Sequence, residues 1–394
     1  MLKRLLEGSP NHSFFLFGAR GTGKSTWLQE VYSKQPHLYI DLLDPDVEER
    51  LAKNPASLLH QIERLDDQTA WVIIDEVQKL PKLLDIVQIG IEKYRKKFAL
   101  TGSSARKLKR GAANLLAGRA FIFHLFPMTY LELGEQFDLH AGLQNGSLPS
   151  LFNLENTQDR HRYLRSYTQT YLKEEITAEQ VIRKLDPFRL FLEIAAQQNG
   201  EILNYTNIAQ DVGVSSLTIQ SYFQILEDTL MGFFLYPYHA SIRKRQRTNP
   251  KFYFFDLGVK RSLDGTVSVP LTENSCGFGK AFEHFVIAEA IRLNSYFEKE
   301  YRFSYLRTKD DAEIDLIVER PGKPLALIEI KSAKAVDERD IRALRAFKKD
   351  MPQQTEAYCF SRDPIAKTID SISLLHWQEG FKAMGLTPLP TAAA

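Results

Sequence analysis

The chain has 394 residues, of which 44% are hydrophobic and 25% are charged, and its formal net charge is +2. This composition fits a globular protein of two or three domains. A nearly neutral chain has no global field that would draw it to nucleic acid or to a membrane, so any nucleic-acid surface has to come from a local basic cluster. No apolar run approaches the roughly 20 residues that a membrane-spanning helix needs.

The N-terminus and the cysteines indicate the cellular compartment. The N-terminal residues 1–6 are too short and too quickly polar for a secretion signal. The two cysteines, Cys276 and Cys359, lie far apart and form neither a disulfide framework nor a zinc-binding pattern. We therefore expect a reduced cytoplasmic protein with no membrane partner.

A phosphate-binding loop follows a short apolar strand predicted over residues 14–17. Residues 18–25 match the pattern G-x-x-x-x-G-K-[ST], and a helix is predicted from residue 25 to 32. The backbone N–H groups of such a loop and helix N-terminus converge on an anion. We expect Lys24 to reach the β- and γ-phosphates of ATP and the Ser25 hydroxyl to bind Mg²⁺. The expected nucleotide-binding residues are Gly18, Ala19, Arg20, Gly21, Thr22, Gly23, Lys24, Ser25 and Thr26.

An acidic pair ends a later strand. After a predicted strand over residues 38–41, residues 71–76 are apolar up to Asp75 and Glu76. We expect Asp75 to enter the coordination sphere of Mg²⁺ and Glu76 to polarise the water that attacks the γ-phosphate. The alternative is a buried strand that ends in a solvated acidic helix cap. The intact phosphate loop upstream favours the NTPase interpretation.

Small hydroxyl and basic residues come next. A strand over residues 97–104 offers Thr101 or Ser103 as a polar sensor between water and phosphate, although the same residues could cap a following helix. Arg106 and Arg119 are candidates for an arginine that stabilises the γ-phosphate in the transition state, from the same chain or from a neighbouring subunit. The alternative for both arginines is a solvated basic helix face.

These motifs resemble one family. The phosphate loop, together with residues 73–76, 100–104 and 115–119, resembles a prokaryotic group of AAA+-like P-loop ATPases, and the resemblance covers nearly the whole chain. It implies an α/β ATPase core with a central parallel sheet over residues 1–135. It further implies a helical, winged-helix domain over residues 136–270 and an α/β domain similar to PD-(D/E)xK nucleases and restriction endonucleases over residues 271–394. By analogy with AAA+-like cores, the chain is a possible homo-oligomer.

The middle of the chain contains a helix-turn-helix pattern. Residues 137–156 predict a loop or linker, and helices are predicted over residues 160–183 and 188–196. Residues 205–219 then place Ala209, Gly213 and Ile219 at helix-turn-helix spacing, and a strand over residues 233–238 would be the wing. The second helix would read DNA or would pack as a structural lid of the ATPase. Its lack of Lys and Arg favours the structural role.

A short basic run follows the predicted wing. Arg243, Lys244, Arg245 and Arg247 are expected to contact DNA phosphates. The alternative is a solvated hairpin tip.

The last third carries a second chemical cluster. A helix is predicted over residues 279–290, and strands over 302–307, 313–318 and 325–331 precede a helix over 337–347. Strand alternation puts Glu329 and Lys331 on one face, and Asp315 comes from the adjacent strand. The two carboxylates could hold Mg²⁺, Glu283 could be a further ligand, and Lys331 could orient the attacking water. This arrangement resembles the PD-(D/E)xK nuclease pattern, with Glu-Ile-Asp in place of Pro-Asp. The alternative is a degenerate domain used for docking.

The sequence therefore predicts a protein that binds and hydrolyses ATP and acts on DNA, with ATP and Mg²⁺ as cofactors. In this hypothesis, the ATPase drives or gates a Mg²⁺-dependent nuclease-like C-terminal domain. The alternative is a regulatory or scaffold ATPase whose C-terminal domain binds nucleic acid without cutting it. A toxin-defence or transcription module is a third hypothesis.

Overall fold

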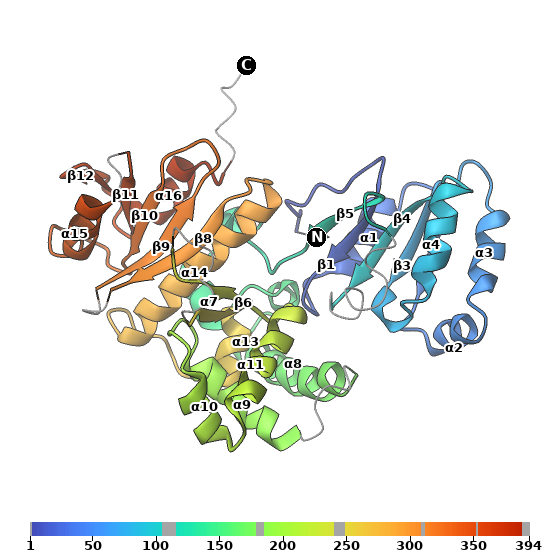
Figure 1. Cartoon of the computed structure of the whole chain (residues 1–394), viewed down its shortest axis with the longest axis horizontal. Coiled ribbons are helices and arrows are strands. Elements are labelled where there is room, and N and C mark those ends of the chain that lie inside the picture. The colour runs from blue at the N-terminus through green and yellow to red at the C-terminus, as the bar shows by residue number, and fades with distance from the viewer. Residues whose placement is uncertain are drawn as a thin grey trace. The chain divides into compact units, whose positions relative to one another are not determined.

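The computed structural model describes residues 2–104, 116–178, 185–239, 249–308, 312–351 and 354–387, with residues 171–178 described by their backbone alone. The chain forms two compact units (Figure 1). The first unit contains Met1–Met128, Leu148–Phe152 and Gln224–Met231, and the second contains Thr129–Ser147, Asn153–Phe223 and Gly232–Ala394. None of the helices in the described parts of the chain is long and apolar enough to cross a membrane.

The first unit is built on a five-stranded parallel sheet in the order β2-β3-β4-β1-β5, which confirms the predicted α/β fold. Its strands are β1 (Ser13–Phe17), β2 (His37–Asp41), β3 (Trp71–Asp75), β4 (Lys97–Gly102) and β5 (Ala120–His124). Its helices are α1 (Lys24–Tyr32), α2 (Pro45–Lys53), α3 (Ala56–Glu63) and α4 (Leu83–Glu92), with the short 3-10 helix η1 (Val77–Lys79). Parallel strands need such crossover connections.

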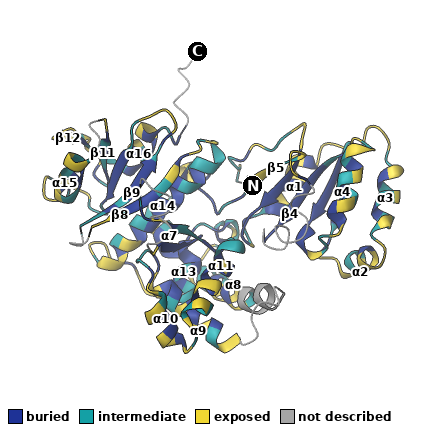
Figure 2. Cartoon of the chain, viewed as in Figure 1, coloured by how far each residue is buried: buried dark blue, intermediate teal, exposed yellow. Residues whose placement is uncertain are grey.

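Both faces of the three inner strands β3, β4 and β1 are covered, so these strands are mostly apolar and are buried along almost their whole length (Figure 2). On one face, Gly90 of α4 lies directly over the Phe98 ring, and a Cβ at position 90 would be 2.5 Å from that ring. On the other face, the ring of Phe14 packs edge-on against those of Trp27 and Trp71. The sheet is therefore a rigid support for residues at its carboxyl edge.

The second unit contains a six-stranded mixed sheet in the order β12-β13-β11-β10-β9-β8. Its strands are β8 (Arg302–Arg307), β9 (Glu313–Glu319), β10 (Ala326–Ile330), β11 (Glu356–Ser361), β12 (Lys367–Ile369) and β13 (Ile372–His376). Helix α15 (Arg342–Asp350) covers one face through Leu344 and Phe347, which join the core cluster of Cys359. Helices α14 (Cys276–Tyr296) and α16 (Trp377–Met384) cover the other face, where Phe381 packs on Phe360.

The rest of the second unit is mainly helical. It contains α6 (Tyr130–Leu133), α7 (Leu139–Asn145), α8 (Thr157–Ala178), α9 (Leu185–Gln197), α10 (Tyr205–Val212) and α13 (Leu257–Leu263), with the antiparallel strands β6 (Gly232–Leu235) and β7 (Lys251–Phe254). Gly213, at φ 74°, ends α10, and the Ser215 hydroxyl accepts a hydrogen bond from the Thr218 amide at 3.1 Å at the start of α11 (Ser216–Asp228). These contacts confirm the two predicted helices and the turn between them.

The predicted loop over residues 137–156 is wrong. That segment contains α7 and the 3-10 helix η3 (Pro149–Asn153). The Asp138 carboxylate caps α7 by accepting from the Ala141 amide at 2.6 Å. Helix α13 packs closely on α7, because a Cβ at Gly258 would lie 1.9 Å from the Asn145 carbonyl oxygen. This tertiary contact stabilises a helix whose glycines predict a loop.

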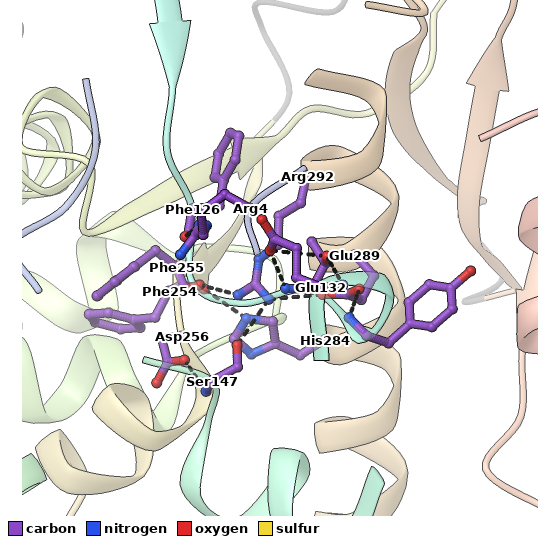
Figure 3. A network of polar contacts seen from close by, with 12 residues as sticks. Arg4, Phe126, Glu132, Ser147, Phe254, Phe255, Asp256, His284, Glu289 and Arg292 are labelled. Atoms are coloured by element: carbon purple, nitrogen blue, oxygen red, sulfur yellow. Dashed lines mark hydrogen bonds and ion pairs between the residues drawn. The ribbon is translucent and has the colours of Figure 1, made fainter. Parts of the chain in front are cut away.

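Helix α14 is held by a buried polar network (Figure 3). The Arg292 guanidinium lies 2.9 Å from a Glu289 carboxylate oxygen and donates to the Phe255 carbonyl at 2.7 Å and the Ser147 hydroxyl at 3.2 Å. The other Glu289 oxygen accepts from the Tyr130 amide at 3.0 Å. Burial raises the pKa of Glu289 to about 7 although Arg292 opposes the shift. The network thus joins α14 to α6, to α7 and to the segment after β7.

A buried histidine extends this network along α14. Burial lowers the pKa of His284 to about 3, so its imidazole is neutral. Its Nε2 lies 2.7 Å from the Phe254 carbonyl, and its Nδ1 lies 3.2 Å from the Asn199 amide nitrogen. A neutral ring that donates through Nε2 and accepts through Nδ1 satisfies both contacts. We therefore regard His284 as a structural residue.

Replacing Arg292 with Met should destabilise the second unit by about 3–5 kcal/mol, because the variant leaves the Glu289 carboxylate buried without its partner. Urea denaturation followed by circular dichroism would measure the loss. The matched control is Lys382→Met, since Lys382 pairs with Glu379 at 2.7 Å on the surface. That change should cost less than about 1 kcal/mol. Equal effects of the two substitutions would contradict a stabilising role for the buried network.

Candidate functional site

The predicted phosphate loop connects β1 to α1 in a conformation that requires glycine. Gly21 and Gly23 have φ angles of 78° and 91°. A Cβ at Gly18 would lie 2.4 Å from the Leu125 carbonyl oxygen, so the loop passes close to the chain that follows β5. Gly23 precedes α1 and provides no side-chain cap, which leaves the first-turn amides of α1 for an external anion. The loop therefore fits a phosphate group.

Lys24 is buried inside this loop, with 5% of its surface exposed. Its Nζ donates to the carbonyl oxygens of Gly18 at 2.9 Å and Ala19 at 3.3 Å, and lies 4.0 Å from Glu76 Oε1. Arg4, which the sequence analysis did not identify, donates to the Thr22 carbonyl at 3.2 Å and so supports the loop from outside. Of the other predicted loop residues, Arg20 and Thr26 are exposed and Ser25 is half-buried at the start of α1.

Asp75 lies buried at the carboxyl end of β3, where two hydroxyl groups hold it. Tyr39 donates to Asp75 Oδ2 at 2.7 Å, and Thr101 donates to Oδ1. The Glu76 amide donates back to the Thr101 hydroxyl at 2.9 Å. Burial, with the neighbouring Asp75 carboxylate, raises the pKa of Tyr39, so its phenol stays protonated as a donor. Because β4 lies between β1 and β3, Thr101 comes between the loop strand and the acidic strand.

Glu76 has a left-handed backbone, with φ 60° and ψ 46°. Its Oε2 accepts hydrogen bonds from the Ser103 hydroxyl at 3.1 Å and from the Gln78 amide, and Gln78 also donates to Ser103 at 3.0 Å. The structure thus brings both sensor candidates, Thr101 and Ser103, to the acidic pair. Gln78 lies in η1, just after the acidic pair, and belongs to no sequence motif. Its role is visible only from its contacts with Glu76 and Ser103.

Only one of the two arginine candidates is described by the structure, and it does not lie at this site. Arg106 falls outside the described residues. Arg119 precedes β5, whose register pairs Ala120 with Ser13, so it lies at the amino edge of the sheet, opposite the phosphate loop. There its guanidinium contacts Glu92 at 2.7 and 2.8 Å. Arg119 is therefore not placed to reach a nucleotide in the loop of its own chain.

A second cluster of charged residues lies on the sheet of the second unit. Strands β9 and β10 are antiparallel, and their paired register ends at Ile328 and Leu316, the neighbours of Glu329 and Asp315. Asp315 Oδ2 accepts from the Ile330 amide at 2.6 Å, and Lys331 Nζ lies 2.6 Å from Glu329 Oε1. The structure thus brings together the three residues that the sequence predicted from strand alternation.

Glu283 of α14 and two residues of β7 join the same cluster. The Tyr253 hydroxyl donates to Glu283 Oε1 at 2.8 Å. Lys251 Nζ lies 3.4 Å from that oxygen and 2.5 Å from Glu313 Oε1. Lys251 is not among the site residues predicted from the sequence. No local signal marks it, because its partners are more than 30 residues away along the chain.

Burial and mutual repulsion make the carboxylates of this cluster harder to ionise. Burial and the neighbouring charges of Glu329 and Glu283 raise the pKa of Asp315 well above its usual range. Burial also raises the pKa of Glu329, although Lys331 opposes the shift. Glu329 Oε2 is buried and has no hydrogen-bond partner among the residues that the structure describes. Carboxylate oxygens suit Mg²⁺ and Mn²⁺, so the donor set fits a hard divalent ion. Within the described ranges, however, no three acidic, His or Cys residues are already arranged to hold a metal ion.

The structure describes only some of the residues that could contact DNA. Arg243, Lys244, Arg245 and Arg247 lie outside the described residues. On α11, Gln220 and Ser221 are exposed, and Leu217 is exposed over 72% of its surface. This helix face carries no charge along residues 216–221.

Three family models match the chain in succession. Residues 10–134 match an AAA domain, residues 136–269 match a domain of unknown function (DUF8612), and residues 278–377 match another (DUF4143). The first of these matches contains the phosphate loop, the acidic pair and the five-stranded parallel sheet. Residues 10–134 therefore form an AAA-like P-loop ATPase domain.

Relatives along most of the chain carry no assigned function. An uncharacterised protein of Mycobacterium tuberculosis is 28% identical over 325 residues, which cover 82% of this chain and 70% of the relative. An uncharacterised protein of Methanocaldococcus jannaschii is 24% identical, with 88% of this chain and 80% of the relative covered. A solved structure, the Walker-type ATPase of Pyrococcus abyssi, has 14% identity and a TM-score of 0.43, and the match covers 64% of this chain and 91% of that one.

Replacing Lys24 with Ala should weaken ATP binding about 10- to 100-fold, because a charge-assisted contact to phosphate is lost. Titration of a fluorescent ATP analogue with Mg²⁺ would measure the change. Lys79→Ala is the matched control, since Lys79 follows the acidic pair but pairs with Glu48 at 2.5 Å. Unchanged binding in Lys24→Ala would contradict the assignment of the loop.

Proposed function

We propose that the first unit binds ATP with Mg²⁺ and hydrolyses it at the carboxyl edge of its sheet. The observation that carries this proposal is the meeting of Lys24, Asp75, Glu76 and Thr101 at that edge. Lys24 would exchange its bonds to loop carbonyls for the phosphates. Ser25 and Asp75 would hold Mg²⁺, which supplies charge neutralisation at the phosphates when bound.

Glu76 is the residue that would act on water. Its carboxylate would orient the water molecule and accept its proton as the water oxygen attacks the γ-phosphorus and the bond to the β-phosphate oxygen breaks. Ser103 and Gln78 set the direction of this carboxylate through Oε2, and Thr101 fixes its backbone. If Arg119 takes part, it would act on a nucleotide of a neighbouring subunit, which would make the active form a homo-oligomer.

We further propose that the ATPase gates a C-terminal domain that cleaves DNA. Asp315, Glu329 and Glu283 would hold a divalent ion, which supplies Lewis acidity at the scissile phosphate. Lys331 would orient the attacking water and stabilise the developing negative charge. As the water oxygen bonds to phosphorus, its proton would pass to solvent water; the bond from phosphorus to the leaving deoxyribose oxygen breaks, and that oxygen would take up a proton from solvent water. The convergence of Asp315, Glu329 and Lys331 supports this proposal, as does the winged-helix interpretation of α10, α11 and the β6-β7 pair.

A second candidate function is an ATP-dependent switch whose C-terminal domain binds nucleic acid without cutting it. The carboxylate cluster favours this candidate, because no three acidic, His or Cys residues among those described are arranged to hold a metal ion. The ammonium groups of Lys251 and Lys331 already contact Glu283, Glu313 and Glu329. DNA cleavage separates the two candidates.

Replacing Glu76 with Gln should lower the rate of ATP hydrolysis at least about 100-fold, because the variant cannot accept the proton of the water. ATP binding should stay within about twofold of the wild-type protein, since Gln preserves the shape and the acceptor oxygen. Phosphate release and analogue binding would be measured together. Glu48→Gln, which removes a surface carboxylate of α2 paired with Lys79, is the control. Wild-type turnover in Glu76→Gln would disprove the role of Glu76.

Cleavage of single-stranded, duplex and branched DNA should require Mg²⁺ or Mn²⁺ and should be lost in Asp315→Ala, because a metal ligand is removed. Asp337→Ala is the control, since Asp337 pairs with Arg339 on the surface of the same unit. If ATP gates the site, Lys24→Ala should also lose ATP-dependent cleavage. No metal-dependent cleavage of any DNA form by the wild-type protein would reject the nuclease and leave the switch.

A further inference from the structure

A pocket of about 360 Å³ lies within the second unit, bordered by α13, by the segment that follows α13 and by the first turn of α14. Its wall combines apolar with basic side chains, among them Leu257, Val269, Leu271, Lys260, Arg261 and Lys280. A volume of this size lies at the lower end of the range that small organic ligands occupy. The mixed lining suits a ligand that has one charged group and an apolar body.

Arg261 is a buried cation of this pocket, and none of the described carboxylates forms an ion pair with it. Only 6% of its surface is exposed. Its Nη2 donates to the carbonyl oxygens of Thr266, at 2.6 Å, and of Val269. Its Nε is buried and has no hydrogen-bond partner within the described part of the chain. Burial lowers the pKa of Arg261, and the nearby charge of Asp264 opposes this shift. A buried guanidinium that is compensated mainly by carbonyl groups favours an anion beside it.

The two lysines of the pocket differ from Arg261, because each has an acidic partner. Lys260 Nζ lies 2.6 Å from Asp264 Oδ2, and Lys280 Nζ lies 2.5 Å from Glu201 Oε1. The other oxygen of Asp264 accepts from the amide and the hydroxyl of Thr266, at 3.1 and 2.6 Å. Both acids are thus occupied by other groups, and the charge of the guanidinium is left for an anion from outside the chain.

The first turn of the 21-residue helix α14 borders the same pocket through Ser275 and Gly277. The Ser275 hydroxyl caps the helix by accepting from the Phe278 amide at 3.1 Å. The amides of Cys276 and Gly277 precede it and have no partner within the helix. Gly277 also leaves room, since the side chain nearest to a Cβ at this position would be Leu271, at 3.8 Å. The positive end of a helix dipole and the buried guanidinium therefore face one pocket.

We propose that this pocket binds a small organic anion, whose phosphate or carboxylate group lies between the Arg261 guanidinium and the first turn of α14. The planar fork of an arginine suits two oxygens of such a group, and the helix amides would donate to the remaining lone pairs. The apolar wall would contact the body of the ligand. The pocket shares no residue with the phosphate loop or with the carboxylate cluster around Asp315. This inference therefore goes beyond the proposed ATPase and nuclease and depends on neither.

The test is saturation-transfer NMR on the full chain with three probes that share an aromatic body, namely phenyl phosphate, benzoate and the neutral benzyl alcohol. The Lys24→Ala protein is used throughout, so that phosphate binding at the loop of the first unit is suppressed. At least one of the two anions should bind with a Kd of about 1 mM or lower, and benzyl alcohol should bind at least about tenfold more weakly. The comparison of the two anions identifies which oxyanion the pocket prefers.

Gly277→Asp should weaken anion binding at least about tenfold, because the new carboxylate occupies the place of the ligand and repels it. The fold should tolerate this change, since an acidic residue in the first turn of a helix is stabilising. Gly277→Asn is the matched control, because it has the same shape without the charge, and it should retain the affinity within about threefold.

Arg261→Met should also weaken anion binding at least about tenfold, because a charge-assisted contact is lost. Arg261→Lys, which keeps the charge without the fork, should bind with an intermediate affinity. Circular dichroism would show whether each variant folds. If Arg261→Met does not fold, the pair of substitutions at Gly277 decides the outcome.

Several results would overturn the anion site. These are a failure of both anions to bind, equal binding of benzyl alcohol, and unchanged anion binding in a folded Arg261→Met or Gly277→Asp protein. Binding of either anion that both substitutions weaken would support the site. ATP hydrolysis and DNA cleavage are measured separately, so failure of the anion site and failure of either proposed activity are distinguishable.

Discussion

Each candidate site depends on how the fold compensates the charged side chains that it buries away from water. A buried ion is tolerated only where opposite charges or hydrogen bonds replace its hydration. Lys24 meets this requirement with two loop carbonyls, and Asp75 meets it with the hydroxyls of Tyr39 and Thr101. In the second unit, Lys251 and Lys331 do the same for the carboxylates around them. The polar partners of these ions are therefore as much a part of each site as the residues that would contact a ligand.

The two sheets bring these partners together in different ways. In the parallel sheet, all strands end at one edge, so the loop after β1, the acid at the end of β3 and the hydroxyl of β4 meet although they are far apart in sequence. In the antiparallel pair β9-β10, Asp315 and Glu329 follow directly on the last paired residues, Leu316 and Ile328, and Asp315 accepts from the Ile330 amide. The first arrangement suits a phosphate group that lies across several strands. The second suits a single ion held between neighbouring side chains.

The sequence could predict what depends on short-range spacing. The phosphate loop, the acidic pair, the parallel sheet and the grouping of Asp315, Glu329 and Lys331 all follow from motif spacing or from strand alternation. Tyr39, Gln78 and Lys251 could not be found in this way, because each meets its partner only through the tertiary fold. The segment over residues 137–156 was predicted as a loop for the same reason, since the packing of α13 on α7 outweighs its local glycines.

The two hypotheses for the C-terminal domain differ in what neutralises the negative charge of the carboxylate cluster around Asp315 and Glu329. If the lysines and a retained proton were enough, the cluster would be an ionic core, and the domain would bind without cutting. The raised pKa of Asp315 agrees with a retained proton in the metal-free protein. It does not account for Glu329 Oε2, which is buried and without a hydrogen-bond partner in the described structure. Other buried atoms of the described residues, among them Ser304 Oγ and Thr355 Oγ1, also lack a hydrogen-bond partner, so this oxygen does not by itself mark a metal site. The two hypotheses therefore differ in whether Asp315 keeps its proton or gives it up to a bound cation.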